Sequence, residues 1–258
     1  MLLPRIIPCL LVRNGGLVKT VNFGKSKYVG DPINAVKIFN EKEVDELIVI
    51  DIDATVLNRE PNYTMIEHLA AECRMPLCYG GGVKNPDQVR RIIQLGVEKV
   101  AISSKAIAEP YIIIKSAENV GNQSIVVVLD VKQSSKGIYE VWTHNARINT
   151  KYDFIELAQK MVDFGAGEIL VNSIDNDGLM KGYDFKLIEK IINSVNIPIT
   201  ILGGAGSMHD LGSVIEKFGT IGVAAGSLFV FKGVYKAVLI NYPHRDDKLA
   251  LFGELFRS

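Results

Sequence analysis

Cysteine is scarce in this chain, and tryptophan occurs once in 258 residues. The three cysteines, Cys9, Cys73 and Cys78, are odd in number, lie in or beside apolar runs and lack the paired spacing of a zinc site. We interpret them as reduced core residues of a cytoplasmic protein. The sequence gives no reason to expect a metal ion or another cofactor.

A net charge of either sign is also missing, because 29 Lys and Arg residues balance 29 Asp and Glu residues. No long-range field therefore favours nucleic acid or an anionic membrane surface, and an anionic ligand must be held by local groups. No apolar stretch approaches the length of a membrane span, and the start, Met1-Leu-Leu-Pro-Arg5, does not resemble an export signal. We expect a cytoplasmic protein that is neither exported nor inserted into a membrane.

Short runs rich in Ile and Val alternate with longer segments of helical period, which indicates successive βα units around a parallel sheet. Eight such units fit the length of one (β/α)8 TIM barrel, predicted as a single domain over residues 1–258. A doubly wound open sheet is the main alternative, but its phosphate fingerprint is absent after the first strand. The predicted strands are 6–12, 46–51, 77–79, 99–102, 125–130, 168–173, 199–202 and 221–225.

The chain repeats itself at an offset of 122 residues. The run beginning Glu46-Leu-Ile-Val-Ile-Asp aligns with the run beginning Glu168-Ile-Leu-Val-Asn-Ser, and Pro76-Leu-Cys-Tyr-Gly-Gly aligns with Pro198-Ile-Thr-Ile-Leu-Gly. A run of matches at one offset predicts that the barrel consists of two repeated (β/α)4 halves.

Glycine and serine follow four of the predicted strands. We define a first cradle, Gly80, Gly81 and Gly82 with Ser103 and Ser104, and a second cradle, Gly203 and Gly204 with Gly226 and Ser227. Glycine lets the backbone approach a phosphate closely, and barrel enzymes often hold phosphate after strands 7 and 8. Two cradles on opposite rims predict a ligand with a phosphate at each end. Each glycine run taken alone could instead only form a tight turn.

Carboxylates and amides gather at the same ends of the strands. Asp130 ends the fifth strand and is the favoured general acid or base, since a partly desolvated carboxylate suits proton transfer. Loop bracing and helix capping are the alternative roles for such residues. The other candidates for contact with a polar substrate are Asp51, Asn145, Asn172, Asp177 and Gly178.

Charges of both signs stand at the opposite, amino-terminal ends of the strands: Arg5, Glu46, Lys99 and Glu168. We expect them to face one another around the barrel bottom as a ring of ion pairs. Such a ring could be a structural plug, since opposed charges need partners there. It could also gate an axial path through the barrel.

Taken together, these residues resemble the HisF family, the cyclase subunits of imidazole glycerol phosphate synthase. The resemblance implies a barrel that receives ammonia from a HisH-like glutaminase docked at its bottom, through a gate at Arg5, Glu46, Lys99 and Glu168. It also implies a bis-phosphorylated ribulosyl-formimino substrate, split and cyclised to imidazole glycerol phosphate and an aminoimidazole carboxamide ribotide. Asp130 and Lys19 match catalytic residues of the family. The motifs that carry the resemblance are Arg5-Ile-Ile-Pro-Cys-Leu10, Asn22-Phe23, Gly30-Asp-Pro32, Gly165-Ala-Gly-Glu-Ile-Leu170, Ser173-Ile-Asp175, Gly182-Tyr-Asp184 and Gly203-Gly-Ala-Gly206.

The chain departs from the family pattern at the end of the first strand. Leu11 stands where the family has the first of two catalytic aspartates, and Ser103 and Asn172 replace the usual asparagine and threonine. A leucine cannot transfer a proton, so the cyclase reaction is placed in question. The chain is more similar to a HisF-like subgroup associated with surface polysaccharides, whose members are thought to supply ammonia to a third, amide- or amidine-forming enzyme. Two hypotheses therefore stand: a cyclase subunit, and a subunit that delivers ammonia without cyclising.

Overall fold

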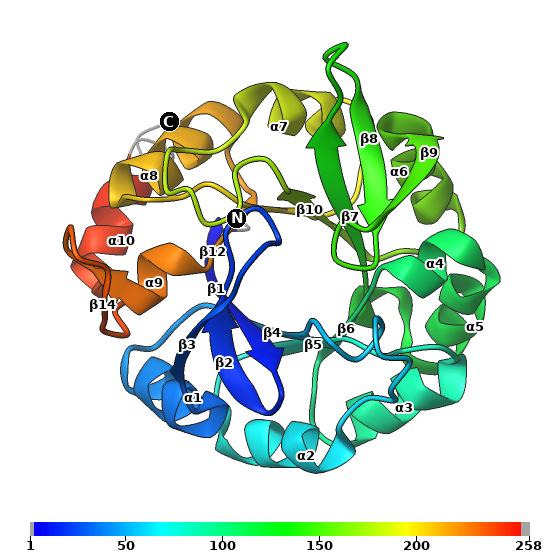
Figure 1. The fold of residues 1–258 in the computed structure, drawn as a ribbon, viewed down its shortest axis with the longest axis horizontal. Coiled ribbons are helices and arrows are strands. Elements are labelled where there is room, and N and C mark those ends of the chain that lie inside the picture. The colour runs from blue at the N-terminus through cyan, green and yellow to red at the C-terminus, as the bar shows by residue number, and fades with distance from the viewer. Residues whose placement is uncertain (1–2, 254–258) are drawn as a thin grey trace.

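Eight parallel strands close into a barrel in the computed structural model, which describes residues 3–253 (Figure 1). Each strand pairs in parallel with its neighbours, and the pairing of the fifth with the sixth strand of the barrel closes the ring. The predicted fold is thus confirmed. The barrel strands are β1 (Arg5–Arg13), β4 (Leu47–Asp51), β5 (Leu77–Gly80), β6 (Lys99–Ile102), β7 (Ile125–Gln133), β10 (Glu168–Ser173), β11 (Ile199–Leu202) and β12 (Gly222–Ala225).

Helices form the outer ring around these strands (Figure 1). Two of them begin at a proline after a capping side chain: Asp31 accepts from the third residue of α1, and Asn85 does the same for α3. No helix within residues 3–253 is long and apolar enough to cross a membrane. The helices are α1 (Pro32–Glu41), α2 (Tyr63–Glu72), α3 (Pro86–Gln94), α4 (Ser104–Ala108), α5 (Tyr111–Val120), α6 (Phe154–Asp163), α7 (Phe185–Ile192), α8 (Met208–Phe218), α9 (Ser227–Val230) and α10 (Arg245–Phe252), with a 3-10 turn η1 (Asn122–Ser124).

Two antiparallel hairpins, which the sequence did not predict, extend the barrel at the carboxyl ends of β1 and β7. The strands β2 (Gly16–Lys19) and β3 (Lys27–Gly30) continue from β1, and β8 (Tyr139–Thr143) and β9 (Ile148–Asp153) continue from β7. They lie on opposite sides of the barrel in Figure 1, as the two-fold repeat requires. A third, short hairpin joins β13 (Phe231–Lys232) to β14 (Ala237–Val238).

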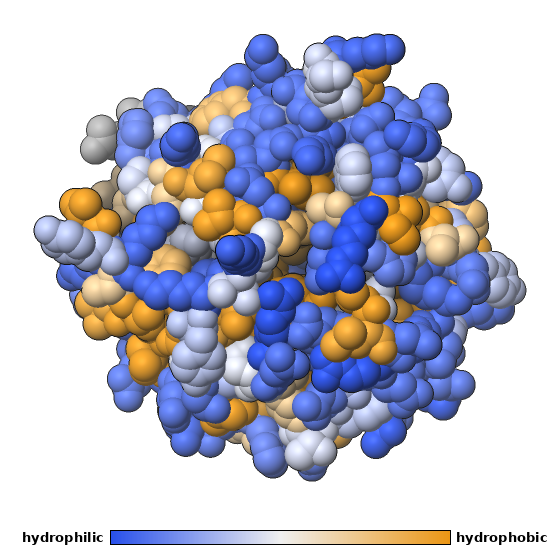
Figure 2. All heavy atoms as spheres, viewed as in Figure 1, coloured by the Kyte–Doolittle hydropathy of each residue, from blue (hydrophilic) through white to orange (hydrophobic). Residues whose placement is uncertain are grey.

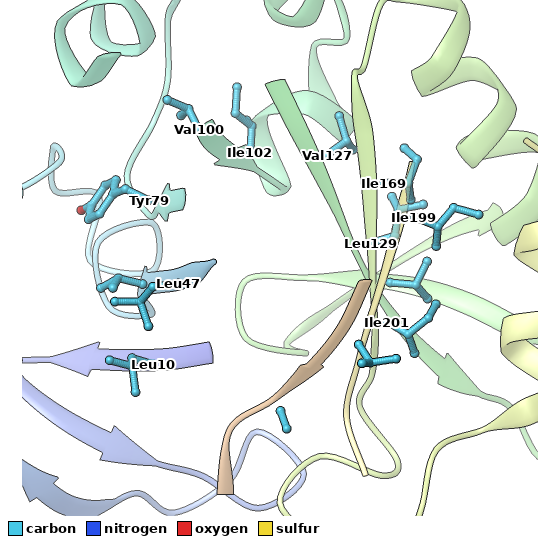
Figure 3. Packing of buried hydrophobic residues seen from close by; sticks show 14 of the residues in the cluster. Leu10, Leu47, Tyr79, Val100, Ile102, Val127, Leu129, Ile169, Ile199 and Ile201 are labelled. Atoms are coloured by element: carbon cyan, nitrogen blue, oxygen red, sulfur yellow. The ribbon is translucent and has the colours of Figure 1, made fainter. Parts of the chain in front are cut away.

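Apolar side chains point alternately to the two faces of each barrel strand. Those facing outward form one cluster with apolar residues of the helices, and Figure 3 labels Leu10, Leu47, Val127 and Ile169 among its members. Those facing inward form a separate cluster along the barrel axis. The members of this inner cluster are Ile7, Cys9, Ile48, Cys78, Ala101, Val126, Leu170 and Ala224, with Leu11, Ile50, Val128 and Leu202 packed on it.

Candidate active site

A cavity of about 420 Å³ opens at the mouth of the barrel, where the carboxyl ends of the strands meet. On the face shown in Figure 2, both hydrophilic and hydrophobic side chains surround a hollow near the centre. Every residue that the sequence predicted for this end lines the cavity. These are Leu11, Lys19, Asp51, Gly80, Gly81, Gly82, Ser103, Ser104, Asp130, Asn145, Asn172, Asp177, Gly178, Gly203, Gly204, Gly226 and Ser227.

The glycines of the two cradles have matching geometry. Gly81 and Gly203 both have positive φ, +118° and +100°, and a Cβ would lie 2.4 Å from the Asp51 carbonyl oxygen in one case and 2.6 Å from the Ser173 carbonyl oxygen in the other. Asp51 and Ser173 are themselves separated by the repeat offset. Gly81 and Gly203 therefore do form tight turns, and contact of their backbone with a phosphate stays a prediction. The same lack of side chains leaves the backbone open to a ligand at both rims.

Lysines stand beside each cradle, and sequence reasoning missed two of them. Lys84 and Lys105 line the cavity near the first cradle, where Lys84 Nζ donates to the Asn58 carbonyl oxygen at 2.9 Å and Lys105 pairs with Glu109 at 2.6 Å. Lys105 directly follows Ser104 and Lys84 lies two residues after Gly82, and this closeness to the cradle motifs is the signal that could have identified them. Lys84 donates to the uncharged Asn58 and keeps its positive charge beside the first cradle, whereas Glu109 balances the charge of Lys105.

Lys19, at the end of β2, reaches the second cradle. Its side chain is buried, Nζ donates to the carbonyl oxygen of Cys9, and a Cβ on Gly226 would lie 2.4 Å from that nitrogen. Burial lowers the pKa of Lys19, an effect partly offset by Cys9 and Asp177. Gly226 therefore makes the space that Lys19 occupies.

Asp130 lies on the inner side of β7 and accepts a hydrogen bond from Asn172 Nδ2 at 3.1 Å. Burial raises its pKa to about 7, although the hydrogen bond from Asn172 lowers it. A carboxyl group with this pKa can both give and take a proton near neutral pH.

Leu11 occupies the position in the first half that Asp130 occupies in the second. In the parallel register Leu11 is paired with Ile50 and Asp130 with Asn172, and Ile50 and Asn172 are related by the repeat offset. The Leu11 side chain packs on the inner cluster. The cavity floor is therefore apolar on one side and carries the carboxyl of Asp130 on the other.

The remaining predicted carboxylates brace loops. Asp51 Oδ1 accepts from the backbone N–H groups of Asp53 and Ala54 at 3.0 and 3.1 Å, and Asp177 Oδ2 accepts from Thr20 Oγ1 at 2.9 Å and from the N–H of Phe23 at 3.3 Å. Burial raises the pKa of both carboxyls, against these hydrogen bonds. Asp177 thereby fastens the loop after β2 over the mouth.

Amides and hydroxyls complete the cavity wall. Asn145 Nδ2 bridges from the loop between β8 and β9 to the carbonyl oxygen of Ile52 at 2.7 Å. Ser103 Oγ and Asn172 Oδ1 are buried without a hydrogen-bond partner among the described residues, so both can serve a polar ligand. No three His, Cys, Asp or Glu side chains within residues 3–253 are grouped as a metal ion would need.

The four charged residues at the barrel bottom, here called the bottom network, meet as one closed set of ion pairs. Lys99 Nζ contacts Glu46 Oε1 and Glu168 Oε2, each at 2.9 Å, and Arg5 contacts Glu168 at 2.8 Å and also pairs with Glu46. Burial alone would raise the pKa of Glu168, but the charges of Arg5 and Lys99 and hydrogen bonds outweigh it and lower the pKa to about 2. For Lys99, burial alone would lower the pKa, but the charges of Glu168 and Glu46 together outweigh burial and raise it. The predicted ring of ion pairs is therefore present in this structure.

Comparison with known proteins relates the chain to enzymes of histidine biosynthesis. The family model described as histidine biosynthesis protein matches residues 5–236. A Leptospira interrogans protein provisionally named imidazole glycerol phosphate synthase subunit HisF is 55% identical over 98% of this chain and 100% of its own length. A Vibrio vulnificus protein provisionally named subunit hisF3 is 54% identical over 96% of both chains. The imidazole glycerol phosphate synthase subunit HisF of Streptomyces griseus is 40% identical over 88% of this chain and 90% of its own.

Proposed function

Because this chain belongs to the histidine biosynthesis protein family and is similar to HisF subunits along most of its length, we propose that it is the synthase subunit of a glutamine amidotransferase complex. A HisH-like glutaminase docks at the barrel bottom and releases ammonia there. The ammonia travels along the barrel axis and reacts with a phosphorylated small molecule held at the mouth.

The observation that carries this proposal is the pair of symmetry-related cradles on either side of one cavity that contains Asp130. Cradles at opposite rims suit a ligand with a phosphate at each end, and the lysines beside them supply the charge that retains it. The family substrate, a bis-phosphorylated ribulosyl-formimino compound, has this form.

The inner cluster supports the axial route for ammonia. Between the bottom network and the cavity, the side chains facing the axis are apolar or small, among them Ile7, Ile48 and Ala101. Burying an unpaired ammonium ion in such surroundings is costly, whereas neutral ammonia carries no charge to desolvate. The bottom network then stands at the entrance of the route.

Asp130 and Lys19 are the residues proposed to perform proton transfer. With a pKa of about 7, Asp130 can protonate a leaving nitrogen or oxygen and take a proton back in the same cycle. The lowered pKa of Lys19 brings that amine closer to the same range. Together they act on the substrate that the family converts to imidazole glycerol phosphate and aminoimidazole carboxamide ribotide.

A second candidate function is favoured by Leu11. Without the first carboxylate, the barrel is suited to pass ammonia to a third, amide- or amidine-forming enzyme, such as one that modifies a surface-polysaccharide sugar. The identities of 55% and 54% to provisionally named relatives, against 40% to the Streptomyces griseus subunit, agree with such a divergence.

A steady-state assay of the purified protein with the bis-phosphorylated substrate and an ammonium salt tests the cyclase reaction. If the protein is a cyclase, its turnover should be well above that of an Asp130→Asn variant. Equal turnover of the two proteins would favour the ammonia-delivery function. Mixing the protein with its glutaminase tests the shared part of the proposal. We expect a complex to form and glutamine hydrolysis to become faster. If no complex forms and glutamine hydrolysis is not stimulated, both proposed functions are refuted.

A further inference from the structure

A threonine belongs to the barrel bottom together with the four charged residues. Thr200, on β11, is fully buried, and its side chain faces the barrel interior beside Arg5 and Glu168. Its neighbours Ile199 and Ile201 face the helices instead. A hydroxyl in a fully buried position is costly unless it is hydrogen-bonded, and a valine would fill the same space without that cost. The hydroxyl itself therefore needs an explanation.

The direction of each hydrogen bond at Thr200 is fixed by chemistry. Arg5 Nη2 lies 3.3 Å from Thr200 Oγ1, and a guanidinium can only donate, so the hydroxyl oxygen accepts. The hydroxyl proton then remains for the carboxylate of Glu168, with which Thr200 Oγ1 is also hydrogen-bonded. Thr200 thus links the cation to the anion by a second path, parallel to their direct contact at 2.8 Å.

Gly222 makes room for this arrangement. The sheet register places Arg5, Gly222 and Thr200 side by side on β1, β12 and β11. A Cβ on Gly222 would lie 2.1 Å from Thr200 Oγ1 and 3.2 Å from Arg5 Nη2. A side chain at residue 222 would therefore push the hydroxyl away from its partners.

We propose that Thr200 is a positioning residue of the bottom network, whose hydroxyl ties Arg5 to Glu168 and holds both across the entrance to the barrel axis. Being uncharged, it adds a donor and an acceptor while preserving the balance of two cations and two anions. Its importance for ammonia transfer rests on the proposed function. Without the hydroxyl, Arg5 and Glu168 keep only their direct contact and separate more often, which opens the entrance to water.

Exchange of the Arg5 guanidinium protons with water, followed by NMR on the isolated protein, tests the proposal. Thr200→Val removes the hydroxyl and keeps the side-chain shape, so exchange should be about 10- to 100-fold faster, as loss of one hydrogen bond to a charged group implies. Thr200→Ser keeps the hydroxyl and should restore slow exchange. Unchanged exchange in Thr200→Val would overturn the proposal, as would equally fast exchange in Thr200→Ser.

A second variant and a second measurement separate this role from others. Gly222→Ala displaces the hydroxyl while leaving Thr200 in place, and it should also accelerate exchange at Arg5; slow exchange there would count against the proposal. In the complex with glutaminase, Thr200→Val should lose more ammonia to solvent per glutamine hydrolysed, with the KM for glutamine unchanged. If the wild-type protein transfers no ammonia at all, the proposed function fails, while the exchange measurement still decides the role of Thr200.

Discussion

At the scale of single residues, the proposed chemistry depends on the contrast between Leu11 and Asp130. The register puts both at the same height of the barrel, in halves related by the repeat. One position offers a carboxyl group with a pKa of about 7, and the other offers a methyl-terminated side chain packed on the inner cluster. Acid and base on opposite sides of a reacting centre require two groups, so the chain has half of the expected pair.

Restoring the second carboxylate should restore cyclisation if everything else needed for it is present. We expect Leu11→Asp to raise turnover of the bis-phosphorylated substrate by about 10²–10⁴-fold, the usual contribution of a general acid or base. Leu11→Asn is the matched control, because it is nearly the same size and polarity but does not titrate. Steady-state kinetics with ammonium salt would measure both, and equal turnover in the two variants would show that more than this carboxylate has been lost.

Asp130 should also affect how stability varies with pH. Its pKa is about 7 in the folded protein and 3.8 in an unperturbed chain, so the folded state binds the proton more tightly. Stability is therefore highest below the unfolded pKa and falls as pH rises toward 7. Because the Asp130 side chain is partly exposed in the cavity wall, we expect a discounted loss of about 1–2 kcal/mol. Asp130→Asn should therefore be more stable than wild type by this amount at pH 8 and equally stable at pH 4. Urea unfolding at both pH values measures the difference. A difference that is the same at pH 4 and pH 8 would show that the pKa of Asp130 is not raised in the folded protein.

At the scale of secondary structure elements, the turns after β5 and β11 depend on glycine. Gly81→Ala and Gly203→Ala would each bring a Cβ to within 2.4 or 2.6 Å of a carbonyl oxygen, at positive φ. We expect each to destabilise the protein by about 3–5 kcal/mol, combining backbone strain with overpacking. Gly15→Ala is the control: its φ is +76° but no atom lies within 4 Å of the added Cβ, so about 1 kcal/mol is expected. Thermal or urea unfolding would compare them, and a Gly81→Ala cost no larger than that of Gly15→Ala would contradict the argument.

The sequence predicted the barrel strands well because each is a short apolar run with its own turn signals. Several strand ends were shifted by only a residue or so, but the fifth strand was predicted to end at Asp130 and continues to Gln133. Its extension exists because β8 pairs with it, which depends on residues far from the strand itself. The first hairpin did carry a signal, since Asn14 and Gly15, with φ of +50° and +76°, form the turn expected of an Asn-Gly pair.

The candidate site was predictable where the repeat duplicated a motif, and obscure where a contact joined distant strands. The glycines at residues 81 and 203 were identified by their common offset and do line one cavity. Thr200 was missed because Ile-Thr-Ile reads as an ordinary buried strand. Its meaning comes only from Arg5 and Glu168, which β1 and β10 bring to it.

At the scale of the whole molecule, the barrel has a charged end and an end with an open cavity, joined by an apolar interior. The bottom network is neutral as a set, and its two glutamates are nearly fully buried. Breaking a buried ion pair by removing one partner leaves an unpaired charge, which is costly, whereas replacing a pair by apolar groups can be nearly neutral. The fold therefore depends on the network being complete, whatever the network does for ammonia.

This dependence gives a prediction for Glu46, which contacts both cations. Glu46→Gln leaves an excess buried positive charge and should cost about 3–5 kcal/mol, and the double variant Glu46→Gln with Lys99→Met, which restores neutrality, should recover a large part of it. Glu118→Gln, which breaks the exposed pair with Lys115, is the control and should cost less than 1 kcal/mol. Urea unfolding at neutral pH measures all three. A double variant less stable than Glu46→Gln would mean that the network stabilises the barrel through its specific contacts, since restoring charge balance would then have given no relief.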